Sequence, residues 1–199
     1  MNQKPIICIP ENDPKIRYIL GRKGFNNLLV IALNPSTATA VKHDGTTDNI
    51  DKIAAVNGYD GWVLFNLSPQ RTQYPHLLDV EPNDTCFAEN RNLMEAVVMN
   101  EEWGISNIWL AWGNNIIERN YLKEQAYSML DRLQKYDLKY WHIKNTLKGH
   151  PYHPAKQPIN RYIGPVATIR LLPLEIKAYF RSLKPLGLDR DFTIRTMKE

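Results

Sequence analysis

The sequence has few cysteines, no long apolar run and no low-complexity linker. Its two cysteines, Cys8 and Cys86, are too few for a disulfide framework or for a four-thiolate zinc or iron–sulfur site, and burial statistics favour small core residues. No stretch approaches the roughly 18 apolar residues that a membrane helix needs, and the N-terminus has no signal-peptide pattern. We therefore expect a cytoplasmic protein with one domain over residues 1–199, a core at about 17–183 and a polar tail at 185–199.

Positive charge is concentrated in the last third of the chain. The net charge is only +4, but lysine and arginine clearly outnumber aspartate and glutamate from Tyr140 onward, where tyrosine, tryptophan and histidine are interleaved with them. This pattern is typical of a surface that binds a polyanion such as DNA. A solvated, lysine-rich surface without a partner explains the charge equally well.

Alternating strand and helix patterns predict an α/β fold. Three apolar runs, each closed by polar or conformationally special residues, predict buried strands at 28–33, 62–67 and 107–112. Further patterns predict an edge strand or hairpin at 17–22, helices at 47–56, 84–100, 118–135 and 174–183, and a strand at 139–143, with a proline-rich loop after Gly149. We expect a three-layer sandwich with a mostly parallel central sheet.

Four polar motifs follow these strands and are expected to meet at one edge of the sheet. They are the segments at 33–36 (LNPS), 66–71 (NLSPQR), 111–114 (AWGN) and 150–156 (HPYHPAK). Because the carboxyl ends of parallel strands lie on the same edge, one pocket can collect residues from all four.

Two residues near the first of these strands can take part in chemistry. Asn34 directly follows the most apolar strand and precedes a proline, and its carboxamide can hold both a water and a base edge; an ordinary turn is the alternative. The loop at 42–47 enters the first helix, where backbone N–H groups favour an anion. In that loop Asp44 can orient a water or simply cap the helix, and the neighbouring His43 has no evident partner.

The last motif carries two imidazoles and a lysine. His153 is a candidate donor to a leaving group or phosphate, and Lys156 is a candidate phosphate contact. His150 and His153 lack nearby cysteine or carboxylate companions, so we predict no metal and no other cofactor.

In this order, the motifs LNPS, GYDGW, NLSPQR, AWGN and HPYHP resemble a family of bacterial and phage proteins with the pattern LNPS…GYGG…NL…R…AWG…HP. That family is in turn similar to the uracil-DNA glycosylase superfamily, especially its mismatch-specific thymine/uracil branch. The resemblance covers about 17–156, places the catalytic asparagine on Asn34 and the late His-Pro motif on His153 and Pro154, and departs from that branch at Ser36, where the branch has glycine. It implies a uracil-DNA glycosylase-like fold.

The resemblance also implies roles for further residues. Asn34 would position a water, Asp44 would assist it or stabilise a cationic sugar, and His153 would stabilise the leaving base. Base contacts are expected from Pro35, Ser36, Tyr59, Asn66 and Trp112, and DNA phosphate contacts from Arg71, Lys148, Lys156 and Arg161.

These expectations describe a monofunctional DNA glycosylase that flips out and excises a modified pyrimidine, with DNA as its partner, no membrane association and a monomeric state favoured. A neutral asparagine suits a base that leaves readily, such as uracil, whereas the polar loop at 37–47 suggests room for a bulky modified pyrimidine, including the modified cytosines of phage DNA, with a role in defence against phage. A non-catalytic nucleic-acid-binding protein and a hydrolase of small nucleosides stay open, because a fold does not determine a function.

Overall fold

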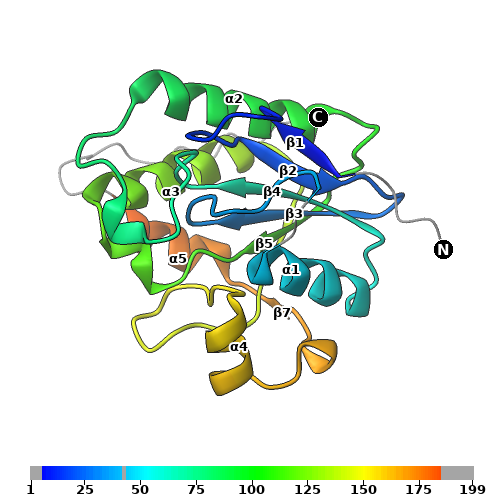
Figure 1. Ribbon diagram of the computed structural model, residues 1–199. Helices are drawn as coiled ribbons and strands as arrows, with labels where there is room; N and C mark the ends of the chain where they lie inside the picture. Colours follow the sequence, from blue (N-terminus) through cyan, green and yellow to red (C-terminus); the bar gives the residue numbers. More distant parts are fainter. Residues whose placement is uncertain (1–5, 42–43, 185–199) are drawn as a thin grey trace, which may run out of the picture.

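The computed structural model describes residues 6–41 and 44–184, which form an α/β fold around one seven-stranded mixed sheet (Figure 1). The strand order is β1-β2-β4-β3-β5-β6-β7. In chain order the strands are β1 (Ile7–Ile9), β2 (Ile19–Arg22), β3 (Asn27–Ala32), β4 (Gly61–Asn66), β5 (Asn107–Leu110), β6 (Lys139–His142) and β7 (Leu172–Pro173).

The prediction of a mostly parallel sheet is wrong. The four central strands, β4-β3-β5-β6, are parallel, but β1 pairs with β2, β2 with β4, and β6 with β7 in antiparallel fashion. The reason is local. The segment at 17–22, predicted as an edge strand or hairpin, forms β2 and pairs with β1, a strand that was not predicted. This hairpin lies beside β4 instead of crossing over through a helix.

Helices cover both faces of the sheet, so that the layers are helix, sheet and helix. On one face lie α2 (Asp84–Met99), α3 (Asn120–Leu133) and α5 (Ile176–Leu183), and on the other lie α1 (Gly45–Val56) and α4 (Lys156–Tyr162). Figure 1 shows α2 and α1 on opposite sides of the strands. Successive residues of β3 point to alternate faces, since Leu29 and Ile31 pack in the core under α2 while Leu28 and Val30 pack in the core under α1.

The helices at 47–56, 84–100 and 118–135 were predicted close to their observed positions, whereas α4 was missed. The segment after Gly149 was expected to be a loop because of its prolines. Pro158 is the third residue of α4, where the backbone N–H has no partner inside the helix, so proline is tolerated there. The predicted tail from residue 185 lies outside the described residues. Within the described residues, no helix has the length and apolarity to cross a membrane.

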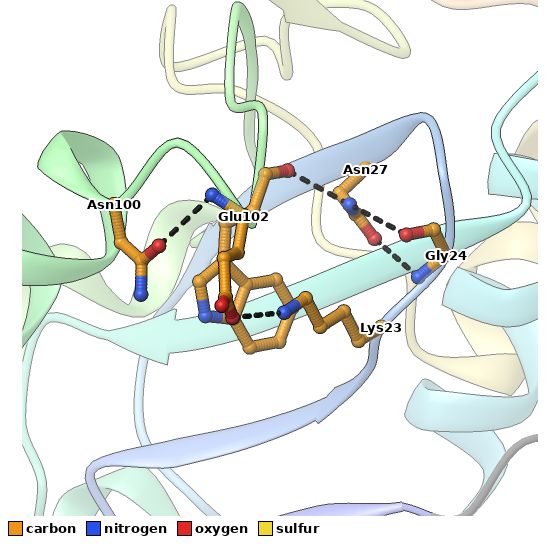
Figure 2. A network of polar contacts seen from close by, with 6 residues as sticks. Lys23, Gly24, Asn27, Asn100 and Glu102 are labelled. Carbon is orange, nitrogen blue, oxygen red and sulfur yellow. Dashed lines mark hydrogen bonds and ion pairs between the residues drawn. The ribbon is translucent and has the colours of Figure 1, made fainter.

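A polar network closes the amino-terminal edge of the central strands (Figure 2). The side chain of Asn27 accepts from Gly24 N at 2.6 Å and donates to the Trp103 carbonyl at 2.8 Å, and Lys23 pairs with Glu102 at 2.7 Å. These contacts join the start of β3 to the turn before β5. The opposite, carboxyl-terminal edge is therefore the one left to form a site.

Candidate functional site

The carboxyl edge of the parallel strands opens into a cavity of about 790 Å³. Its walls begin at the ends of β3, β4 and β5, where the neighbours β4 and β5 lie on opposite sides of β3. Ligands of open α/β sheets bind at such a point, because the connections leave the edge there in opposite directions. The cavity collects six of the predicted site residues: Asn34, Ser36, Asp44, Asn66, Trp112 and His153.

Asn34 is fixed so that it offers an acceptor to the cavity. Its Nδ2 donates to the Thr72 carbonyl at 2.7 Å and to the Pro35 carbonyl at 3.0 Å. Both partners are carbonyl oxygens, so the amide nitrogen must face them and the orientation of the amide is determined. Its two N–H groups are used, and Oδ1 is the atom that can accept a hydrogen bond from a water or ligand.

Asp44 is the N-cap of α1, as the alternative interpretation had it. Its Oδ1 accepts from Thr46 N at 3.0 Å and from Thr47 N at 2.9 Å, and Thr47 Oγ1 in turn accepts a hydrogen bond from Asp44 N. The carboxylate therefore already occupies the N–H groups of Thr46 and Thr47, two of those expected to favour an anion at this helix start. The same carboxylate lines the cavity, and its hydrogen bonds to described residues all go to Oδ1.

His153 presents a neutral imidazole to the cavity. Burial lowers its pKa to about 4, and the charge of Asp44 opposes this shift only in part. Its Nδ1 lies 3.1 Å from Ala155 N and accepts that N–H. The single proton of the neutral ring is therefore on Nε2, which is the atom left to donate.

The loop that carries His153 is held against both the sheet and α1. Gly113 N donates to the Pro151 carbonyl at 2.8 Å, and Asn49 Nδ2 donates to the Pro154 carbonyl at 2.9 Å. Gly113 has φ +74°, and a Cβ there would lie 2.9 Å from the Cβ of His153. The glycine of the AWGN motif therefore lets the histidine loop approach the end of β5.

The low pKa of His153 predicts a pH-dependent stability. The ordinary pKa of 6.5 applies in the unfolded chain and about 4 in the folded one, so between these values only the unfolded chain binds the proton. Stability from this group is complete above pH 6.5 and is lost as the pH falls toward 4. We expect the melting temperature of wild type to fall more steeply over this range than that of His153→Gln, which has no such proton to bind. His142 and His150, whose pKa values are also lowered, are present in both proteins, so equal slopes would contradict the prediction.

Asn66 and Trp112 reach the cavity in different ways. Asn66, at the end of β4, is 1% exposed, and its Nδ2 has no hydrogen-bond partner among the described residues. Trp112 is also 1% exposed and donates its Nε1–H to the Tyr179 hydroxyl at 2.9 Å, in the core under α5. Trp112 is therefore mainly a core residue that also lines the cavity, whereas the Nδ2 group of Asn66 can still donate hydrogen bonds to a ligand.

Two predicted base contacts are not brought to the cavity. Tyr59 precedes β4 and therefore lies at the amino-terminal edge of the sheet, where it packs against the core under α1. Pro35 contributes its carbonyl to Asn34 and Thr72 but does not line the cavity. Its position before the strand predicted at 62–67 already placed Tyr59 at the amino end of that strand, away from the edge where the four motifs were expected to meet.

The four predicted phosphate contacts fall into two groups. Arg71 is engaged inside the protein, where Nη1 donates to the carbonyls of Ser36 and Ala38 at 3.1 and 3.0 Å. Phosphate contact remains a prediction for Arg71, which is half-buried, and for the other three, which are exposed: Lys148, Lys156 and Arg161. Arg161 lies over the ring of Tyr162, which lines the cavity.

Several lining residues were not predicted from the sequence, above all Arg17 and Lys144. Arg17 is 2% exposed and donates Nη1 to the Ala38 carbonyl at 2.9 Å. The available signal was an arginine inside the apolar run that leads into β2, because a charge in such a run is buried only with a structural or functional reason. Lys144 follows β6 and lies over the ring of Tyr152, another lining residue.

The described residues contain no cluster of three or more histidine, cysteine, aspartate or glutamate side chains that would hold a metal ion. His43, which the sequence analysis placed beside Asp44, lies outside the described residues.

Comparison with known proteins identifies the family of the chain. No curated protein and no solved structure matches the chain. The model of the family described as "Protein of unknown function (DUF1643)" matches residues 17–155, a segment that holds the four parallel strands and every lining residue of the cavity except Tyr162. Since this match spans more than half of the sequence, the chain belongs to the DUF1643 family.

Proposed function

We propose that the protein is a monofunctional DNA glycosylase that receives a flipped-out pyrimidine in the cavity and hydrolyses its N-glycosidic bond. One observation carries this proposal. Asn34, Asp44 and His153 come from three separate segments and line one cavity, where they offer an acceptor, a carboxylate and a neutral donor. The ordered motifs that resemble the uracil-DNA glycosylase superfamily support the same function.

The proposed reaction separates charge, and the three groups match its parts. The C1′–N1 bond breaks and its electron pair leaves with the base, so the sugar becomes cationic and the base anionic. Oδ1 of Asn34 accepts a hydrogen bond from a water, whose oxygen then bonds to C1′ and whose proton passes to solvent. The carboxylate of Asp44 stabilises the cationic sugar, and the base anion takes up a proton from solvent.

A neutral His153 suits the leaving base. Its Nε2–H can donate to an oxygen of the base as negative charge develops there, and a ring with a pKa of about 4 does so near neutral pH without titrating. The imidazole is fixed by Ala155 and by the close approach of Gly113, so little reorganisation accompanies the reaction.

The mouth of the cavity suits a nucleic acid. Leu147 is fully exposed at the tip of a turn that is closed by bonds from Thr146 N to the His150 carbonyl and from Gly149 N to the Thr146 carbonyl. Lys144 and Lys148 flank it in the sequence, and both Leu147 and Lys144 line the cavity. An exposed apolar side chain between cations is suited to contact unstacked bases while the lysines contact phosphates.

The volume of about 790 Å³ leaves room for a base that carries a substituent. We propose a modified pyrimidine, with the modified cytosines of phage DNA as the favoured class and phage defence as the biological role.

The test is excision from duplexes that each contain a single uracil, a thymine mismatch, 5-hydroxymethylcytosine or its glucosylated form. Alkali cleaves the strand at abasic sites, and we expect breaks with a modified cytosine. Breaks with uracil alone would refute the substrate class but not the glycosylase. Intact strands with DNA still bound would favour a binding protein, and release of bases only from free nucleosides, without salt dependence, would favour a nucleoside hydrolase.

A further inference from the structure

Arg17 is a buried cation in the wall of the cavity. Its side chain is 2% exposed, and its hydrogen bond to a described residue runs from Nη1 to the Ala38 carbonyl. Its Nε is buried without a partner, and no carboxylate of the described residues forms an ion pair with it. A buried guanidinium is costly unless its charge and donors are satisfied, so this arrangement calls for a second acceptor.

Asn66 gives an independent indication of a ligand at the same place. Asn66 is only 1% exposed and lines the cavity. Its Nδ2 also lacks a hydrogen-bond partner among the described residues. The two residues lie on neighbouring segments, because Ile16 bridges to Gln70 and Arg17 N donates to the Pro69 carbonyl. Two buried donors without partners therefore occur in one wall.

The charges around the cavity favour an anion there. Among the described lining residues, Arg17 and Lys144 are cations and Asp44 is the one carboxylate. Burial and the neighbouring Arg71 lower the pKa of Arg17 to about 10, which still leaves the guanidinium charged at neutral pH. Asp44 acts on Arg17 electrostatically without a direct ion pair, so its charge offsets that of Arg17 only in part.

We propose that Arg17, with Asn66 beside it, forms an anion subsite that binds an oxygen of the departing base as that base becomes negatively charged. The inference rests on the proposed function, in that it identifies the anion with the leaving group. A buried cation stabilises a developing negative charge more strongly than an exposed one, because little water screens it. The subsite would thus favour the base anion over the neutral base.

The alternative is that Arg17 is purely structural and serves to hold the Ala38 carbonyl. Arg71 Nη1 also donates to this carbonyl, at 3.0 Å, so that contact is already made by a second guanidinium. Holding Ala38 does not explain the unpartnered Nε of Arg17 or its position in the cavity wall.

The experiment measures the binding of two free pyrimidines to the full-length protein by calorimetry at neutral pH. Barbiturate, an anion whose three exocyclic carbonyl oxygens share the negative charge, represents the departing base, and uracil represents a neutral pyrimidine of similar ring size. We expect wild type to bind barbiturate at least about 10-fold more tightly than uracil, as for a hydrogen bond to a charged group. In Arg17→Met the two affinities should differ by less than about threefold.

Three controls accompany this measurement. Arg22→Met removes an arginine of the neighbouring strand β2 that pairs with Asp51 outside the cavity, and it should retain the preference for barbiturate. Arg17→Lys keeps the charge and should retain part of the preference, which covers the case in which Arg17→Met fails to fold. Asp44→Asn removes the opposing carboxylate and should strengthen barbiturate binding.

The outcomes separate this inference from the proposed function. A preference for barbiturate that depends on Arg17 supports the subsite even if no base is excised from DNA. Equal affinity of wild type for the two pyrimidines, or a preference unchanged in Arg17→Met, overturns the inference even where excision is observed.

Discussion

Replacement of Asn34 by alanine is expected to reduce the rate of the proposed base excision by about 100-fold or more, since a water held in reacting position contributes on this order. The amide is fixed by the carbonyls of Thr72 and Pro35, so Oδ1 has one defined direction that alanine cannot reproduce. Single-turnover excision on the preferred duplex gives the rate, and gel-shift titration gives the DNA affinity. We expect the rate to fall while the affinity changes little.

Asn100→Ala is the matched control, because Asn100 accepts from Glu102 N at the opposite edge of the sheet. It should excise at the wild-type rate. An unimpaired Asn34→Ala enzyme would remove Asn34 from the mechanism, and parallel losses of rate and affinity would indicate that the residue only shapes the binding surface.

Replacement of Gly61 by alanine is expected to lower the free energy of unfolding by about 3 kcal/mol, at the upper end of the range for overpacking. A Cβ at this position would lie 2.0 Å from Asn27 Oδ1 and 2.2 Å from Gly24 N, inside the network of Figure 2. Gly61 opens β4 and pairs with Asn27 of β3, so the clash separates two central strands. Urea unfolding followed by circular dichroism measures the loss.

Gly58→Ala provides the comparison within the same turn. Gly58 has φ +87° but no heavy atom within 4 Å of an added Cβ, so it tests backbone strain without a clash. We expect a loss of about 1 kcal/mol, the usual cost of a left-handed conformation for alanine. If the two variants lose equal stability, steric overlap with Asn27 is not what requires glycine at position 61.

The sequence predicted the central strands and their helices because period and burial are local properties. The apolar residues at 28–33 and 62–67 are nearly continuous, as expected for strands covered on both faces, and β3 and β4 are buried throughout. β1 and β7 were missed because they are only three and two residues long and gain their structure from pairing with β2 and β6. Such pairing depends on segments distant in the chain.

The candidate site was predicted in part for the same reason. Asn34, Asn66 and His153 belong to motifs that were expected to meet at the carboxyl edge of the sheet. Their positions along the chain were therefore enough to predict that they line one cavity. Arg17 was missed because it precedes β2, and β2 is antiparallel to β4, so that the start of β2 lies at the carboxyl end of β4 beside the cavity. Arg71 was predicted to contact DNA, yet its guanidinium is used by carbonyls of Ser36 and Ala38, and no local pattern reveals such partners.

The loop around His153 is pinned by Gly113, by Asn49 and by the bond from Tyr152 N to the Lys144 carbonyl at 3.0 Å. A segment held at three points is poorly suited to act as a lid. Under the proposed function, the free-energy cost of bringing a base into the cavity would fall mainly on the DNA, which would have to distort while the protein stays nearly rigid. Bases in mismatched or weakly stacked surroundings would then arrive most readily, so that local duplex stability becomes part of the selection.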